Sequence, residues 1–225
     1  MIKCLLMDVD DTLLDFPWSE RNAIHRTYEA LGTPMTDEMY ERYHTVNRRF
    51  WMAYERGEIE RSAMLIARHR QMTEEYGLPW DPAECERLYR KNLGIGYQLI
   101  PHAIELLDWL KPRCRLFITS NGVAETQYSR LSASGLDAYF ERMFISEEIG
   151  AVKPSKEYFD YVFAHIPGFR AEETAIIGDS LSSDILGGIT SGITTIWFNP
   201  GKKTGRPEVR PDHEISDLLE LKKLF

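Results

Sequence analysis

Short runs of apolar and β-branched residues recur along the chain, each four to six residues long. Such runs are typical of buried strands, and the later ones alternate with helix-like stretches at 125–134, 157–165 and 183–191. Alternation of strand and helix predicts βαβ units and a parallel sheet. The predicted strands lie at 2–7, 115–119, 143–146, 174–178 and 194–198.

A long helical pattern interrupts this alternation between the first and second strand runs. Across residues 17–94 apolar side chains recur at helical spacing, as in Ile24 and Tyr28, and glycine-containing turns divide the segment into about four helices. We therefore expect two domains. An α/β core comprises residues 1–16 and 95–225, and a helical cap comprises residues 17–94.

The end of the chain has a different pattern. Residues 200–211 are rich in Gly, Pro and Lys, which predicts a surface loop. Ser216 follows and is expected to cap a short final helix that runs to residue 224.

Composition narrows the class of protein. The 225 residues are 43% apolar and 28% charged, as in an ordinary soluble protein, and no apolar run approaches the roughly 20 residues of a membrane span. The net charge of −8 argues against binding a nucleic-acid polymer, which needs Lys and Arg to neutralise phosphates. To attract an anionic phosphorylated substrate against this overall negative charge, the protein would need local cationic groups or a bound cation.

The cysteines and the start of the chain predict a cytoplasmic protein. Cys4, Cys85 and Cys114 are odd in number and widely spaced, so we expect reduced thiols and no zinc site. The first eight residues lack the features of a secretory signal and lead directly into the first strand run.

Polar residues of the kinds used in catalysis follow four of the predicted strands. In a parallel sheet ligands bind at the carboxyl ends of the strands, so these residues are expected to converge. Asp8 and Asp10 are only two residues apart, and placing them with Asp179 would be strongly repulsive unless a hard cation such as Mg²⁺ accepted their oxygens. The candidates are Asp8, Asp10, Thr12, Ser120, Asn121, Lys153, Asp179 and Asp184.

These four segments, in this order, resemble the four motifs of the haloacid dehalogenase-like (HAD) hydrolase superfamily. They are Asp8-Val9-Asp10-Asp11-Thr12, Thr119-Ser120-Asn121-Gly122, Gly150-Ala151-Val152-Lys153-Pro154 and Gly178-Asp179-Ser180-Leu181-Ser182-Ser183-Asp184. The resemblance spans nearly the whole chain. It implies a Rossmann-like, three-layer α/β/α core with a helical cap of the type called C1.

The resemblance also implies a role for each motif residue. Asp8 would attack phosphorus and bind Mg²⁺, Asp10 would give its backbone carbonyl to the metal, and Asp179 would complete the protein ligands. Ser120, Asn121 and Lys153 would hold the phosphoryl oxygens. Asp184 and Thr12 would support the site.

The Asp10 side chain distinguishes the possible reactions. Left free of the metal, it can protonate a leaving alkoxide and then deprotonate water, whereas the dehalogenases of the superfamily lack a carboxylate there. A phosphatase is therefore favoured over a dehalogenase. A catalytically silent binding module remains the alternative of a different class, although such members usually lose one of the paired aspartates. Gly178-Asp179-Ser180 lacks the Gly-x-Ser-x-Gly pattern of a serine hydrolase.

The expected substrate is a small phosphate monoester, because C1 caps typically accompany such esters. Residues 46–57, 145–150 and 183–189 resemble the pyrimidine 5′-nucleotidase branch. A sugar-phosphate phosphatase, such as an N-acylneuraminate 9-phosphatase or a phosphoglycolate-type phosphatase, is the alternative. In the cap, Asn47, Arg48 and Trp51 could contact a base or a phosphate, although aromatic residues at helical spacing more often pack in a core. A monomer or homodimer is expected.

Overall fold

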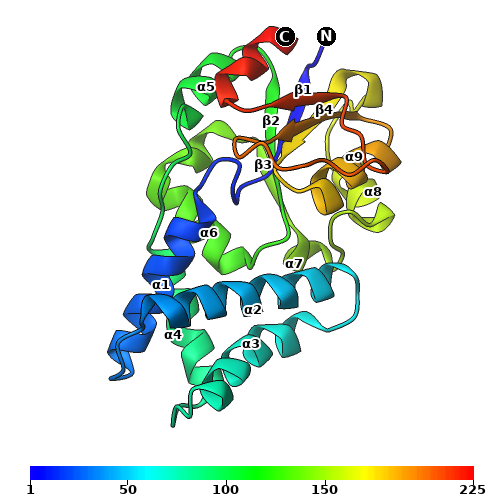
Figure 1. Ribbon diagram of the computed structural model, residues 1–225. Coiled ribbons are helices and arrows are strands. Elements are labelled where there is room, and N and C mark those ends of the chain that lie inside the picture. Colours follow the sequence, from blue (N-terminus) through cyan, green and yellow to red (C-terminus); the bar gives the residue numbers. More distant parts are fainter. The chain divides into compact units, whose positions relative to one another are not determined.

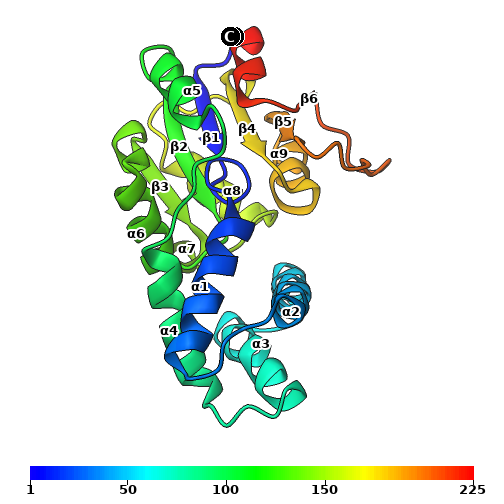
Figure 2. The ribbon, with the colours of Figure 1, turned by 60° about the vertical axis from the view of Figure 1, so that its left-hand side comes forward.

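Six parallel strands form a single sheet in the computed structural model, which describes residues 1–225. Their order is β3-β2-β1-β4-β5-β6, so the first strand lies at the centre (Figure 2). The predicted parallel α/β fold is confirmed, with one strand, β6, that the pattern did not predict. The strands are β1 (Cys4–Met7), β2 (Arg115–Ser120), β3 (Arg142–Ile145), β4 (Thr174–Gly178), β5 (Thr194–Phe198) and β6 (His213–Ile215).

Apolar side chains cover both faces of this sheet, which explains why its strands read as continuous apolar runs. On β1, Leu5 and Met7 belong to one buried cluster, and Cys4 and Leu6 belong to another. Helices contribute to each cluster, so the unit has three layers (Figure 1). The first cluster includes residues of α5 (Ala103–Leu110), α6 (Ala124–Ser134), η1 (Leu136–Tyr139) and η4 (Leu218–Leu224), and the second includes residues of α8 (Lys156–Ala164).

Two predicted helices of this unit differ in detail. The helix expected at 183–191 begins earlier, as a π-helical turn η3 (Leu181–Ile185) that continues into α9 (Leu186–Thr190). The final helix is capped by Asp217 and not by Ser216, because the Asp217 carboxylate accepts the Leu219 N–H at 2.8 Å while the Ser216 hydroxyl donates to Glu220. Shorter elements complete the unit: α7 (Ser146–Ile149) and η2 (Ala171–Glu173).

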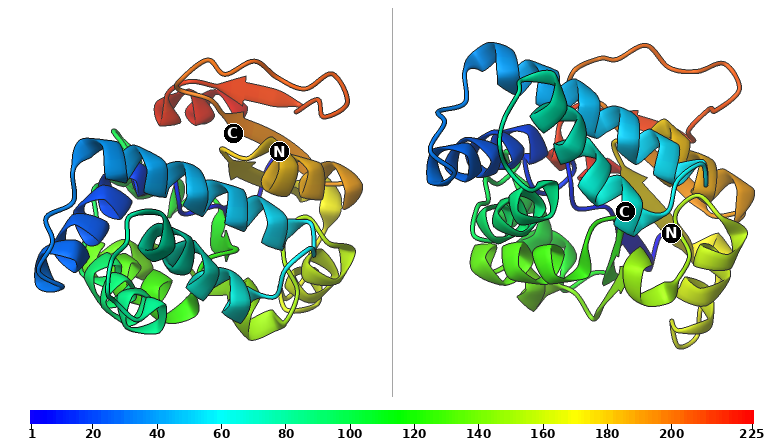
Figure 3. Two further views of the ribbon diagram at one scale, coloured as in Figure 1. Left: turned by 60° about the horizontal axis from the view of Figure 1, so that its bottom comes forward. Right: turned by 90° about the horizontal axis from the view of Figure 1, so that it is seen from below.

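Residues Phe16–Tyr97 form the second unit, and the first comprises Met1–Asp15 with Gln98–Phe225. The expected cap, 17–94, differs from this second unit by one residue at its start and three at its end. Four helices build it, as shown in blue to teal in Figure 3. They are α1 (Phe16–Ala30), α2 (Asp37–Glu55), α3 (Arg61–Glu75) and α4 (Pro82–Gly94).

Local signals in the sequence start two of these helices. The Thr36 hydroxyl accepts the Met39 N–H before α2, and the Asp81 carboxylate accepts the Ala83 N–H before α4, whose first residue is proline. Helix α1 packs on α4, and α3 packs on both α2 and α4. Their shared apolar core includes Tyr28, Tyr43, Met72 and Tyr89.

All three cysteines are free thiols, and burial raises the pKa of Cys4 and of Cys85 to about 11. None of the helices combines the length and apolar character that crossing a membrane requires.

Candidate active site

The loop after β1 presents the first pair of candidate aspartates. The Asp8 N–H continues the ladder to β4 by donating to the Ile177 carbonyl at 3.0 Å. The chain then reverses, because the Val9 carbonyl accepts the N–H groups of Leu13 and Leu14, each at 2.9 Å. Thr12 is fully buried in this turn and its hydroxyl donates to Asp8 Oδ2 at 3.3 Å. Thr12 therefore helps to orient the Asp8 carboxylate, while its supporting role in catalysis stays a prediction.

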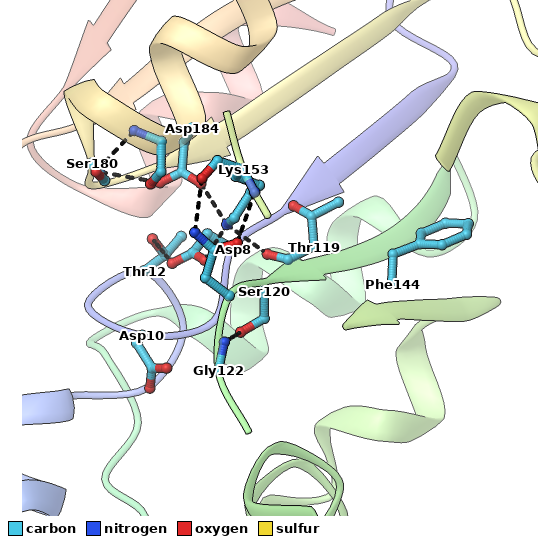
Figure 4. A network of polar contacts seen from close by, with 12 residues as sticks. Asp8, Asp10, Thr12, Thr119, Ser120, Gly122, Phe144, Lys153, Ser180 and Asp184 are labelled. Atoms are coloured by element: carbon cyan, nitrogen blue, oxygen red, sulfur yellow. Dashed lines mark hydrogen bonds and ion pairs between the residues drawn. The ribbon is translucent and has the colours of Figure 1, made fainter. Parts of the chain in front are cut away.

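Lys153, in the segment after β3, contacts residues of the other three motif segments. Its ammonium group donates to Asp8 Oδ1 at 2.7 Å, to Asp184 Oδ1 at 2.6 Å and to the Thr119 carbonyl at 2.9 Å (Figure 4). Burial lowers the pKa of Lys153, but the negative charges of Asp184 and Asp8 outweigh burial, so the net pKa lies above its usual range. Lys153 is thus a fixed cation beside the Asp8 carboxylate.

Asn121 holds the backbone of Lys153. Its side-chain oxygen accepts the Lys153 N–H at 2.9 Å, and its amide nitrogen donates to the Lys153 carbonyl at 3.0 Å. These contacts give Asn121 a part in positioning the Lys153 loop, while donation to a phosphoryl oxygen stays a prediction. The Ser120 hydroxyl accepts from Gly122 N–H at 3.1 Å and from Gln127 at 2.8 Å, which leaves its own proton available to donate.

Three carboxylates gather next to Lys153. Oxygen atoms of Asp8, Asp179 and Asp184 lie within 4.8 Å of one another. Burial raises the pKa of Asp8 to about 7 and that of Asp179 to about 6, and burial also raises the pKa of Asp184. Oxygen donors crowded in a buried place fit a hard divalent cation, which would offset their mutual repulsion.

Asp184 reaches this cluster through a close approach to β4. A Cβ atom on Gly178 would lie 2.2 Å from the Asp184 carboxyl group, so only glycine fits at that position. The second Asp184 oxygen accepts the Ser180 N–H at 3.1 Å. This explains why a glycine precedes Asp179 at the end of the strand.

Two residues near Asp179 were not predicted. Trp197 on β5 donates its indole N–H to the Asp179 carbonyl at 2.9 Å, and the Lys203 ammonium group lies 3.3 Å from Asp179 Oδ2. Lys203 belongs to the predicted loop 200–211, and its backbone is held by Asn199 through hydrogen bonds of 2.8 and 3.0 Å. Strand order brings β5 beside β4, which the spacing of residues along the chain does not reveal.

The Asp10 carboxylate points away from the cluster of Asp8, Lys153 and Asp184 (Figure 4). It accepts from Arg130 Nη1 at 2.5 Å and from Gln127 Nε2 at 2.7 Å. Both partners lie on α6 and neither was predicted. Their three-residue separation places them on one helix face, which is the signal in the sequence that could have found them.

The three residues of the helical unit that are candidates for substrate contact, Asn47, Arg48 and Trp51, differ in how far they are buried. Asn47 is 2% exposed and its amide lies between Glu20, at 2.6 Å, and Arg68, at 2.7 Å. Arg48 is exposed, and the half-buried Trp51 packs edge-on against Tyr54. The described contacts of Asn47 are therefore internal to the unit. Substrate contact by Asn47, Arg48 and Trp51 stays a prediction.

Comparison with known proteins identifies the family. The model of the haloacid dehalogenase-like hydrolases matches residues 2–192. The chain belongs to this HAD hydrolase family. The resemblance read from the four motifs is thereby confirmed.

Three HAD relatives cover nearly all of the chain. The HAD-hydrolase YfnB of Bacillus subtilis is 45% identical over 97% of this chain and 93% of its own. The pyrimidine 5′-nucleotidases PynA of Streptococcus pneumoniae and YjjG of Escherichia coli are 33% and 28% identical, over 97% and 98% of this chain and 94% and 96% of their own.

A solved structure of YfnB resembles the whole HAD chain. It superposes with a TM-score of 0.95 over 99% of this chain and 98% of its own, at 44% identity. That crystal structure has magnesium bound and reveals interdomain movement. The likeness confirms the Rossmann-like α/β fold class.

Proposed function

We propose that this protein is a phosphatase that hydrolyses small phosphate monoesters through a phosphorylated Asp8. The observation that carries the proposal is the fixed Asp8 carboxylate, held by Lys153 on one oxygen and by Thr12 on the other. It lies at the carboxyl end of a central strand, where ligands bind in parallel sheets. A second carboxylate, Asp10, follows two residues later.

The residues supply the two halves of the reaction. An Asp8 oxygen attacks phosphorus, the ester P–O bond breaks, and the leaving oxygen takes a proton from Asp10. A water molecule then gives a proton back to Asp10 and attacks phosphorus, and the bond between Asp8 and phosphorus breaks. Asp8 is regenerated as a carboxylate, and inorganic phosphate leaves.

Positive charge at the site stabilises the transferring phosphoryl group. Lys153 provides one fixed charge, and Ser120 can donate a hydrogen bond. We further propose that Asp8, the Asp10 backbone carbonyl and Asp179 hold Mg²⁺, with Asp184 in support. When bound, the ion neutralises the phosphoryl oxygens and the crowded carboxylates.

A pyrimidine nucleoside monophosphate is the proposed substrate. The support is that PynA and YjjG, relatives that cover nearly the whole chain, are pyrimidine 5′-nucleotidases. We propose that Phe16–Tyr97 acts as the cap that selects the ester, with Asn47, Arg48 and Trp51 as candidates for contact. A sugar phosphate is the second candidate, since N-acylneuraminate-9-phosphatases of mouse and man match at 28% and 27% identity, but over only 63% of this chain.

Phosphate release from a panel of esters tests the proposal. The panel holds pyrimidine and purine nucleoside monophosphates, N-acylneuraminate 9-phosphate, phosphoglycolate and p-nitrophenyl phosphate, each with and without Mg²⁺. We expect the largest kcat/KM with a pyrimidine nucleotide. A higher value with a sugar phosphate would replace the substrate, and no release from any ester would indicate a silent binding module.

A further inference from the structure

Helix α6 forms a closed network of hydrogen bonds around the Asp10 carboxylate. Arg130 Nη1 donates to Asp10 Oδ1 at 2.5 Å, and Gln127 Nε2 donates to Asp10 Oδ2 at 2.7 Å, so each carboxylate oxygen has its own donor. Arg130 Nη1 also lies 3.2 Å from Gln127 Oε1. This last contact fixes which end of the Gln127 amide faces Asp10, because the guanidinium group can only donate.

The network is buried on the helix side and open on the aspartate side. The side chain of Arg130 is 1% exposed, and that of Asp10 is 30% exposed. Arg130 therefore cannot serve as a freely solvated surface charge, whereas a small molecule can still reach Asp10. The same Gln127 nitrogen donates to the Ser120 hydroxyl at 2.8 Å, which couples the strand ends of β1 and β2.

Gly122 supplies an independent observation. A Cβ atom there would lie 2.6 Å from Gln127 Nε2 and 2.9 Å from the two preceding side-chain carbons of Gln127. The glycine that follows Ser120-Asn121 thus makes room for the Gln127 side chain. The loop after β2 and the helix face are fitted to each other at the point where Gln127 reaches Asp10.

We propose that Arg130 and Gln127 are positioning residues that hold the Asp10 carboxylate apart from Asp8, where it can exchange protons with a leaving group, and later with water, on the far side of phosphorus. The inference rests on the phosphatase reaction proposed above. Two donors on separate oxygens fix both the direction of the carboxyl group and its rotation about the Cβ–Cγ bond. Misplacement of a catalytic group by about 1 Å can cost about 100-fold in rate.

The test compares esters that differ in their need for a proton. p-Nitrophenolate leaves with little help, whereas an alkoxide such as that of a nucleotide needs protonation. Arg130→Met and Gln127→Met should lower kcat about 100-fold for the best nucleotide and less than about tenfold for p-nitrophenyl phosphate, with the KM of p-nitrophenyl phosphate unchanged within about twofold. Arg130→Lys should restore part of the loss, because its charge can still reach Asp10.

A double-mutant cycle shows whether Arg130 acts through Asp10. In an Asp10→Asn background, adding Arg130→Met should change the p-nitrophenyl phosphate rate by less than about threefold. If Arg130 acts through the Asp10 carboxylate, the effects of the two substitutions are not additive, because the first has already removed that carboxylate. Gly122→Ala should reproduce the Gln127→Met pattern without altering either α6 side chain. Arg113→Met, at an exposed arginine, is the matched control and should behave like the wild type.

The outcomes separate the inference from the proposed function. Equal losses for both esters, a large rise in KM, or an undiminished effect of Arg130→Met in the Asp10→Asn background would overturn the positioning role. Wild-type protein that hydrolyses no ester would overturn the phosphatase proposal and this inference with it. If Arg130→Met does not fold, as judged by circular dichroism, the Gln127→Met and Gly122→Ala variants decide between these outcomes.

Discussion

Lys153 and Asp184 form an ion pair of 2.6 Å in which the two side chains are 2% and 1% exposed. Two charges buried in this way stabilise each other, but neither tolerates the loss of its partner. Lys153 also donates to Asp8, so the pair links the stability of the fold to the geometry of the proposed nucleophile.

Replacing Lys153 by Met should therefore damage both stability and activity. We expect a loss of about 3–5 kcal/mol in the free energy of unfolding, because Asp184 is left buried without its counter-charge. Urea titration followed by fluorescence measures this loss. Lys156→Met is the control, since the Lys156–Asp160 pair is 80% and 59% exposed and should contribute less than about 1 kcal/mol. Equal losses of unfolding free energy in the two variants would show that the buried pair contributes no more to stability than the exposed pair.

Asp8→Asn should abolish turnover, because an amide is both a poor nucleophile and a poor ligand for Mg²⁺. The variant should keep its fold, since the amide retains an oxygen that can accept from Lys153 or Thr12. Phosphate release from p-nitrophenyl phosphate is the measurement. Retention of more than about one hundredth of the wild-type rate, a barrier change of only ~2.7 kcal/mol, would remove Asp8 from the nucleophile role.

Activity should require Mg²⁺ and disappear in EDTA, and Ca²⁺ should substitute poorly because its coordination is longer and more variable. Mg²⁺ should also raise the thermal unfolding midpoint, because an ion that binds only the folded state stabilises it. Asp179→Asn should weaken both effects. Full activity in the presence of chelator would contradict the metal assignment.

His69 should make the helical unit less stable in acid. Burial lowers the pKa of His69 to about 4, despite its hydrogen bond to Glu86 at 2.9 Å. An unfolded histidine titrates near 6.5, so the stabilising contribution is present above that pH and is lost as the pH falls from 6.5 toward 4. The loss should reach about 2 kcal/mol by pH 5.

Urea unfolding of the wild type and of His69→Gln at pH 7 and pH 5 measures this contribution. The difference between the two pH values should be smaller in His69→Gln. His213→Gln, at an exposed histidine, should keep the wild-type difference. The same pH dependence in all three proteins would assign the acid sensitivity to other groups.

The core could be predicted from the sequence because its strands are buried on both faces and its motif residues lie in the segments that follow the carboxyl ends of those strands. Asp8, Lys153, Asp179 and Asp184 are brought together for that reason. Strand β6 escaped prediction because it has only three residues, of which two are exposed.

The contacts of Asn121, Gln127 and Arg130 could not be predicted in the same way. Each depends on the direction of a side chain across elements that are distant in sequence, such as Asn121 on the Lys153 backbone. Periodicity gives the face on which a residue lies, and it does not give the partner that residue meets. Asn47 shows the same limit within the helical unit, where it contacts Glu20 and Arg68.

The chain leaves and re-enters the α/β unit at almost one point. Asp15 N–H donates to the Gln98 carbonyl at 2.8 Å, and Ile100 N–H donates to the Leu13 carbonyl at 2.9 Å. The segment between Asp15 and Gln98 is therefore an insertion whose two ends are joined by backbone hydrogen bonds of the α/β unit. The entropic cost of closing a loop changes slowly with its length. The α/β unit should therefore tolerate insertions of very different lengths at this point, including a short glycine linker. The α/β unit is thus open to replacement of its helical insertion while its own strands and the residues at their ends are kept.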